Sequence, residues 1–169
     1  SFLDWSASVD GPWAACLNLM DAHYPYTPEP EFNEWGSKEL RDIHDNTEPP
    51  HSESITKSGD WWKLRSFESL YDGGIRQADA AVELLVESLR ARGDLKDTLL
   101  VITSDHGEGF GEWSRLNSSV RMIDHSWGIH EVLTHVPLLV RPPGGGDGHR
   151  QDTLASLTRF PKVVRETTS

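Results

Sequence analysis

The sequence contains one cysteine, Cys16, among its 169 residues. An intrachain disulfide is therefore excluded, and the fold needs no oxidising compartment. Long apolar runs are also absent, since no stretch approaches the roughly 20 apolar residues of a membrane-spanning helix. No signal-peptide pattern is visible, which favours a cytoplasmic location. The chain begins at Ser1 without Met, however, and we expect that a further segment precedes it.

Basic residues are scarce as well. Lys and Arg total 16 against 27 Asp and Glu, and the formal net charge is -11. This charge argues against nucleic acid and anionic membrane surfaces as partners, because their phosphates would be repelled. An acidic, Lys-poor surface is typical of proteins that work in concentrated salt, where carboxylates stay hydrated and their repulsion is screened. An ordinary acidic protein of low-salt surroundings is the alternative, and oligomeric state cannot be inferred from these features.

The most informative segment is 99–108, which reads Leu-Leu-Val-Ile-Thr-Ser-Asp-His-Gly-Glu. A strand-forming run leads into Asp105 and His106, and a Gly then lets the backbone turn sharply. In open α/β sheets ligands bind outside the carboxyl ends of strands, so the pair suggests a divalent cation site with one oxygen and one nitrogen donor. Turn chemistry alone is the alternative. Glu108 and Glu112 either support such a site or belong to the loop surface.

Upstream of this segment the chain changes character twice. The apolar run at 13–20 is short enough for a buried strand or a short helix, and the turn residues after it favour a strand. It leads into a Pro-containing loop at 21–28. Residues 29–66 are polar, contain Pro and lack periodicity, and we expect them to form a long surface excursion.

The segment 69–92 is predicted to be a helix, because its apolar residues recur at helical spacing on one face. Gly93 occupies the position expected for a helix C-cap. A short loop then leads to a predicted buried strand at 98–104, and a second apolar strand is predicted at 136–140. Helix, Gly stop and strand make half of a βαβ unit, so the pattern is typical of part of a mixed α/β sheet.

Three segments occur in an informative order: Met-Asp-Ala-His-Tyr-Pro-Tyr at 20–26, the helix with Thr-Ser-Asp-His-Gly-Glu at 71–108, and His-Ser-Trp-Gly-Ile-His-Glu-Val-Leu-Thr-His-Val-Pro-Leu-Leu-Val at 125–140. Together they resemble the second half of the catalytic domain of the sulfatase family, in the alkaline phosphatase superfamily. The resemblance implies an α/β fold with an alkaline-phosphatase-like mixed sheet flanked by helices, here incomplete. Residues 1–145 would be a partial catalytic domain and 146–169 the start of a truncated C-terminal region.

The resemblance also implies roles for individual residues. Asp105 and His106 match the pair that helps to hold the divalent cation, which is usually calcium in sulfatases. Many sulfatases have Asn in place of His106, and an imidazole here favours Mn or Zn. His23 matches the His of a His-x-Pro loop that contacts the ester oxygen or the leaving group. His125 falls where related sequences place a further active-site His.

The nucleophile of the family is missing from the sequence. Sulfatases carry it in a Cys/Ser-x-Pro-Ser-Arg motif, whereas Cys16 lacks the Pro and Arg and lies too close to His23. The resemblance therefore implies a metal-dependent hydrolase of small sulfate esters, present as a fragment that is inactive alone. A phosphate or phosphonate ester hydrolase of the same superfamily is one alternative. A non-catalytic remnant or metal-binding module is the other.

The charge pattern gives a first testable prediction. If the acidic surface is adapted to high salt, the chain unfolds at low salt and refolds in molar KCl, because screening removes the carboxylate repulsion. Circular dichroism along a KCl titration measures this. A melting temperature that does not change with salt contradicts the adaptation.

Overall fold

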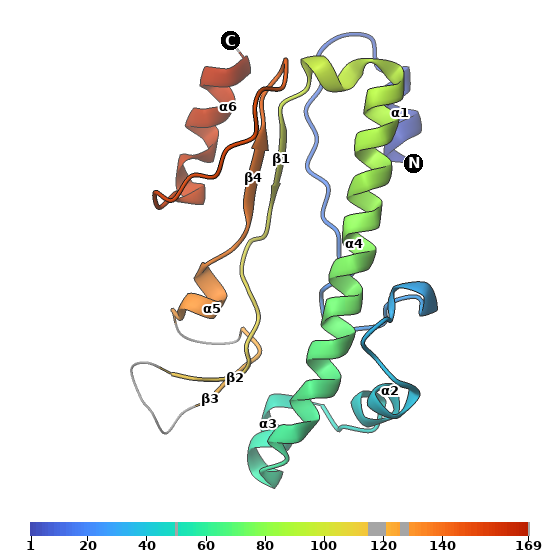
Figure 1. Ribbon diagram of the computed structural model, residues 1–169, viewed down its shortest axis with the longest axis vertical. Helices are drawn as coiled ribbons and strands as arrows, with labels where there is room; N and C mark the ends of the chain where they lie inside the picture. The colour runs from blue at the N-terminus through green and yellow to red at the C-terminus, as the bar shows by residue number, and fades with distance from the viewer. Residues whose placement is uncertain (50, 115–120, 126–128, 169) are drawn as a thin grey trace.

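The computed structural model describes residues 1–49, 51–114, 121–125 and 129–168, and combines helices with short strands (Figure 1). The helices are α1 (Phe2–Ser8), α2 (Lys38–Asp45), α3 (His51–Ser58), α4 (Leu64–Arg92), α5 (Glu131–Thr134) and α6 (Phe160–Thr168). The strands are β1 (Leu100–Thr103), β2 (Phe110–Trp113), β3 (Arg121–Ile123) and β4 (Leu138–Arg141). The predicted mixture of helix and strand is thus confirmed.

Helix α4 is the longest element, and the other segments are arranged along it (Figure 1). It begins five residues before the predicted start at 69 and ends at the predicted Gly93, whose φ of 82° is left-handed. The Gly93 N–H bonds the carbonyl oxygens of Leu89 and Arg90, which closes the helix. A short 3-10 turn, Asp94–Asp97, then leads to β1. In the described part of the chain, no helix is long and apolar enough to cross a membrane.

The strands do not form the single mixed sheet that the sequence pattern predicts. Among the described residues they pair as two separate two-stranded sheets, β1 with β4 and β2 with β3, both antiparallel. The strand at 98–104 was expected to be buried, yet β1 is only half-buried and its last residue, Thr103, is exposed. In β4, residues 138–140 are exposed. An apolar strand sequence encodes a preference for burial, but the layer that covers the strand comes from elsewhere in the fold.

Two upstream segments differ from expectation in opposite directions. Residues 13–20 are extended and mostly exposed, with no strand assigned, because a strand needs a hydrogen-bonded neighbour as well as an apolar sequence. Residues 29–66 were expected to be an irregular surface excursion but contain α2 and α3. Ile55 of α3 is fully buried, so this segment also contributes to the core.

A cluster of buried hydrophobic residues lies at the N-terminal end of α4. It consists of Tyr26, Ile55, Leu64, Phe67 and Leu70. Two of these residues come from segments before the helix, so the core attaches both the 21–28 loop and α3 to α4. The fold thereby fixes the position of the loop that carries the predicted His23.

A close backbone approach fixes the same loop further along α4. A Cβ added at Gly74 would lie 2.1 Å from the carbonyl oxygen of Asp21, so only glycine permits this contact. The Gln77 amide donates to Asp21 Oδ1 at 2.6 Å, and its oxygen accepts from the Glu29 N–H at 2.8 Å. Gln77 therefore connects both ends of the loop to the helix.

The core gives a second prediction. Leu70→Ala should lower the free energy of unfolding by about 2–5 kcal/mol, because a leucine that is 0% exposed leaves a cavity when truncated. Leu84→Ala, on the same helix but 63% exposed, is the matched control and should change stability little. Urea denaturation of both variants checks this. Equal losses would contradict the assignment of the core.

Candidate functional site

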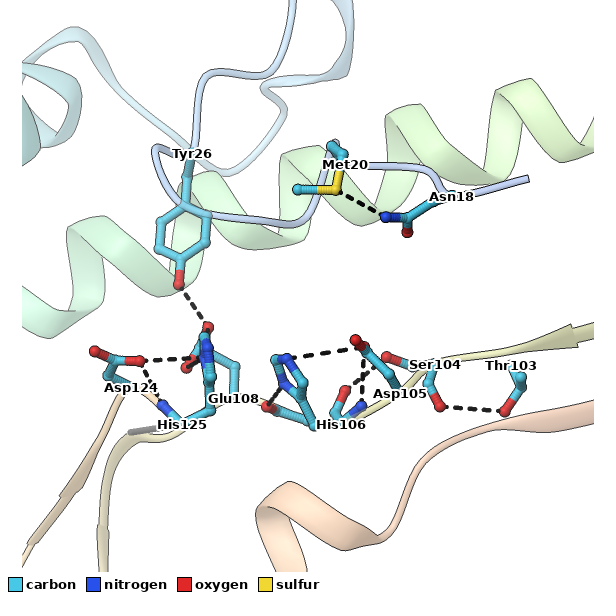
Figure 2. A network of polar contacts seen from close by, with 11 residues as sticks. Asn18, Met20, Tyr26, Thr103, Ser104, Asp105, His106, Glu108, Asp124 and His125 are labelled. Carbon is cyan, nitrogen blue, oxygen red and sulfur yellow. Dashed lines mark hydrogen bonds and ion pairs between the residues drawn. The ribbon is translucent and has the colours of Figure 1, made fainter. Parts of the chain in front are cut away.

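Three loops bring the predicted site residues into one region. His106 follows β1, His125 follows β3, and His23 lies in the loop held against α4. The rings of His106 and His125 are stacked with centroids 4.1 Å apart, and the rings of His23 and His125 are 6.3 Å apart. Figure 2 shows the side chains of His125, His106 and Asp105 in a row, with Tyr26 above the His125 end.

The turn after β1 is shaped by its own polar groups. The Ser104 hydroxyl donates to the His106 carbonyl at 2.6 Å, and the His106 N–H donates to Asp105 Oδ1 at 3.0 Å. Gly107 passes against α5, where an added Cβ would lie 2.0 Å from the Val132 carbonyl oxygen. A glycine is therefore required for the turn to reach α5 and present the two preceding side chains.

The donor atoms of Asp105 and His106 suit a divalent cation. His106 Nδ1 lies 2.8 Å from the Gly107 carbonyl oxygen, which requires a proton on Nδ1 and leaves the Nε2 lone pair available. Nε2 is 3.8 Å from Asp105 Oδ1, and both side chains are accessible, with 38% and 88% exposed. One nitrogen and one oxygen in this arrangement could hold a divalent cation.

His125 lies against carboxylates that sequence reasoning did not include in the site. Its Nδ1 is 3.2 Å from Glu108 Oε1 and 3.1 Å from Asp124 Oδ1. One ligand atom from each of these three residues lies within 4.8 Å of the others. Glu108 could not be assigned from sequence, where a loop-surface role was equally consistent. Asp124 gave no sequence signal beyond its position next to His125.

Glu108 also connects the site to the core. Its side chain is only 7% exposed, and Oε2 accepts a hydrogen bond from the Tyr26 hydroxyl at 3.1 Å. Burial and the negative charge of Glu108 raise the pKa of Tyr26 above its usual range. The phenol therefore stays protonated and remains a donor to the carboxylate.

The His23 loop has its own internal support. His23 Nδ1 lies 2.6 Å from the Tyr24 carbonyl oxygen, so Nδ1 carries the proton of the neutral ring and Nε2 is available. The Tyr24 hydroxyl is 3.2 Å from Nε2 of His51, whose pKa is lowered by burial and by nearby His44. Tyr24 and Tyr26 also meet edge to face, with ring centroids 5.8 Å apart. These aromatic contacts fix the backbone on the C-terminal side of His23.

Comparison with known proteins gives one consistent family. A family model described as Sulfatase matches residues 1–164. The chain is 27% identical to a choline-sulfatase of Rhizobium meliloti over 90% of its own length and 31% of that protein. It is 26% identical to an ulvan-active sulfatase of Formosa agariphila, over 85% of the chain and 25% of that protein. An arylsulfatase K of Bos taurus is 28% identical over 48% of the chain and 14% of its own length.

The chain thus spans at most 31% of the length of these curated relatives. No solved structure matches the chain significantly.

The Tyr26–Glu108 contact gives a third prediction. Tyr26→Phe should destabilise the fold by about 1–3 kcal/mol near neutral pH, because the buried carboxylate loses a donor. Because the folded state raises the Tyr26 pKa, this residue's stabilisation is complete below about pH 10, where unfolded tyrosines ionise, and is lost above it. Above that pH the wild type should lose stability more steeply than the variant. Urea denaturation across this pH range measures both effects, and parallel pH curves would contradict the assignment.

Proposed function

The chain belongs to the sulfatase family, whose model matches nearly all of it, and we propose that it forms the metal-binding and proton-transfer part of a sulfate-ester hydrolase active site. The observation that carries this proposal is the gathering of His23, His106 and His125 from three separate segments. Asp105 lies beside them at the carboxyl end of β1. Such convergence of distant loops is what an active site requires.

Asp105 and His106 are proposed as ligands of a divalent cation. When bound, the ion would act as a Lewis acid that neutralises charge on the sulfuryl oxygens of the ester. The family resemblance favours calcium, whereas the imidazole of His106 favours Mn or Zn. Two protein donors are fewer than such an ion normally takes, so further ligands are expected to complete the shell.

His23 and His125 are proposed as the groups that hold and move protons. An imidazole suits this task because it can take up and release a proton near neutral pH. His23 Nδ1 is occupied by the Tyr24 carbonyl and His125 Nδ1 by carboxylates, so each ring has Nε2 left for the substrate. His23, once protonated at Nε2, would donate that proton to the departing alkoxide, and His125 would be a further group that contacts the ester.

The nucleophile is proposed to lie on a further segment of a longer polypeptide. The sequence contains no Cys/Ser-x-Pro-Ser-Arg motif, and Cys16 lies in an Ala-Cys-Leu context. Covalent catalysis without a nucleophile is unavailable, so this chain alone should not turn over an ester. The chain covers at most 31% of the length of its curated relatives, which supports a nucleophile on a separate segment.

The test is hydrolysis by the complete reading frame that contains this chain. We expect cleavage of 4-nitrophenyl sulfate that EDTA abolishes. Asp105→Asn and His23→Gln should lower kcat/KM by about 100-fold or more, because each removes a ligand or a proton donor. His149→Gln removes an exposed imidazole in the C-terminal segment and is the matched control.

Two results would count against the proposal. If both site variants hydrolysed the sulfate ester with the kcat/KM of the wild type, the assigned roles would be excluded. Cleavage of 4-nitrophenyl phosphate with no cleavage of the sulfate would move the activity to phosphate esters of the same superfamily.

A further inference from the structure

Glu108, Asp124 and His125 form a group of donors that the Asp105–His106 pair does not include. One ligand atom from each lies within 4.8 Å of the others. The three come from two loops, one after β1 and one after β3, and Figure 2 shows Asp124 and Glu108 directed at the His125 ring. Two oxygens and one nitrogen are the donor set that Mn²⁺ and Zn²⁺ accept in proteins.

The separations between these donors match those around a small divalent ion. His125 Nδ1 lies 3.2 Å from Glu108 Oε1 and 3.1 Å from Asp124 Oδ1. Ligands about 2.1 Å from a tetrahedral zinc ion are about 3.4 Å from each other. Small shifts of the side chains would therefore place all three donors in one coordination shell.

The electrostatics of Glu108 provide an independent reason for a cation. Its side chain is 93% buried, yet among the described residues no Lys or Arg lies within ion-pair distance of it. Its partners among these residues are the Tyr26 hydroxyl and the His125 ring, which forms an ion pair with it when protonated. Burying an ionised carboxylate is unfavourable unless a positive charge accompanies it.

We propose that Glu108, Asp124 and His125 Nδ1 bind a Mn²⁺ or Zn²⁺ ion at a site separate from the Asp105–His106 pair. The ion takes the place of the proton on His125 Nδ1 and supplies positive charge beside the buried carboxylate. It ties the loop after β3 to the loop after β1 and fixes the His125 ring against His106. This site does not depend on the proposed ester hydrolysis, because its ligands bind an ion whether or not an ester is cleaved.

The experiment is calorimetric titration of the EDTA-treated 169-residue chain with MnCl₂ and with ZnCl₂. Two variants remove one donor charge each. Glu108→Gln keeps an oxygen to accept the Tyr26 hydrogen bond. Asp124→Asn keeps the backbone, because Asn tolerates the left-handed φ of 67° at this position. We expect each variant to bind the ion at this site, Mn²⁺ or Zn²⁺, at least tenfold more weakly than the wild type.

Three further variants separate this site from its neighbours. Asp105→Asn should weaken the binding of an ion at the Asp105–His106 pair and leave the binding of the ion at Glu108 unchanged. The two proposals can therefore fail independently. Tyr26→Phe removes the hydrogen bond to Glu108 but no ligand, and should retain the ion. His149→Gln controls for binding to an exposed imidazole. Far-UV circular dichroism and thermal melting select the variants that are folded.

The outcomes decide the proposal. Loss of an ion in a folded Glu108→Gln or Asp124→Asn variant, with Tyr26→Phe unchanged, supports the site. Wild-type affinity and stoichiometry in both charge variants overturn it, and the contacts with His125 are then hydrogen bonds only. An equal loss of ion binding in Tyr26→Phe also overturns the site, because the weaker binding would then result from a change in the structure of the loop.

Discussion

The attachment of the 21–28 loop to helix α4 is the constraint on which the site depends. Tyr26 is buried in the core while its hydroxyl donates to Glu108, so one side chain connects the hydrophobic cluster to the polar residues after β1. The absence of a side chain at Gly74 lets the loop backbone lie against the helix. Because the loop is held at both places, the ring centroid of His23 lies 6.3 Å from that of His125.

Charge is the second organising feature of the site. Carboxylates and imidazoles alternate along the two loops, with Asp105 beside His106 and Glu108 beside His125. The rings of His23, His106 and His125 each have Nδ1 near an oxygen acceptor, which favours a proton on Nδ1. A bound cation would supply positive charge to this group of carboxylates and imidazoles.

Local sequence signals were sufficient for the parts of the fold that depend on neighbouring residues. The helix ending at Gly93, the strand before Asp105 and the strand near 138 were all predicted, because capping, periodicity and β-propensity act within a few residues. The order of motifs was also enough to indicate the family that the profile match shows. The helices within 29–66 were missed, since α2 and α3 are only eight residues long, mostly polar and separated by two prolines.

The sequence alone was enough to identify the chemical groups: an Asp-His pair after a strand, a His-x-Pro loop and an excess of acidic residues. Which of these groups meet depends on the tertiary structure. Glu108 and Asp124 are 16 positions apart, and neither carries a local signal for proximity to the other. The pairing of β2 with β3 and the anchoring of Tyr26 bring them to His125. Contacts between distant segments depend on how elements pack together, and packing is a property of the whole fold that no short stretch of sequence encodes.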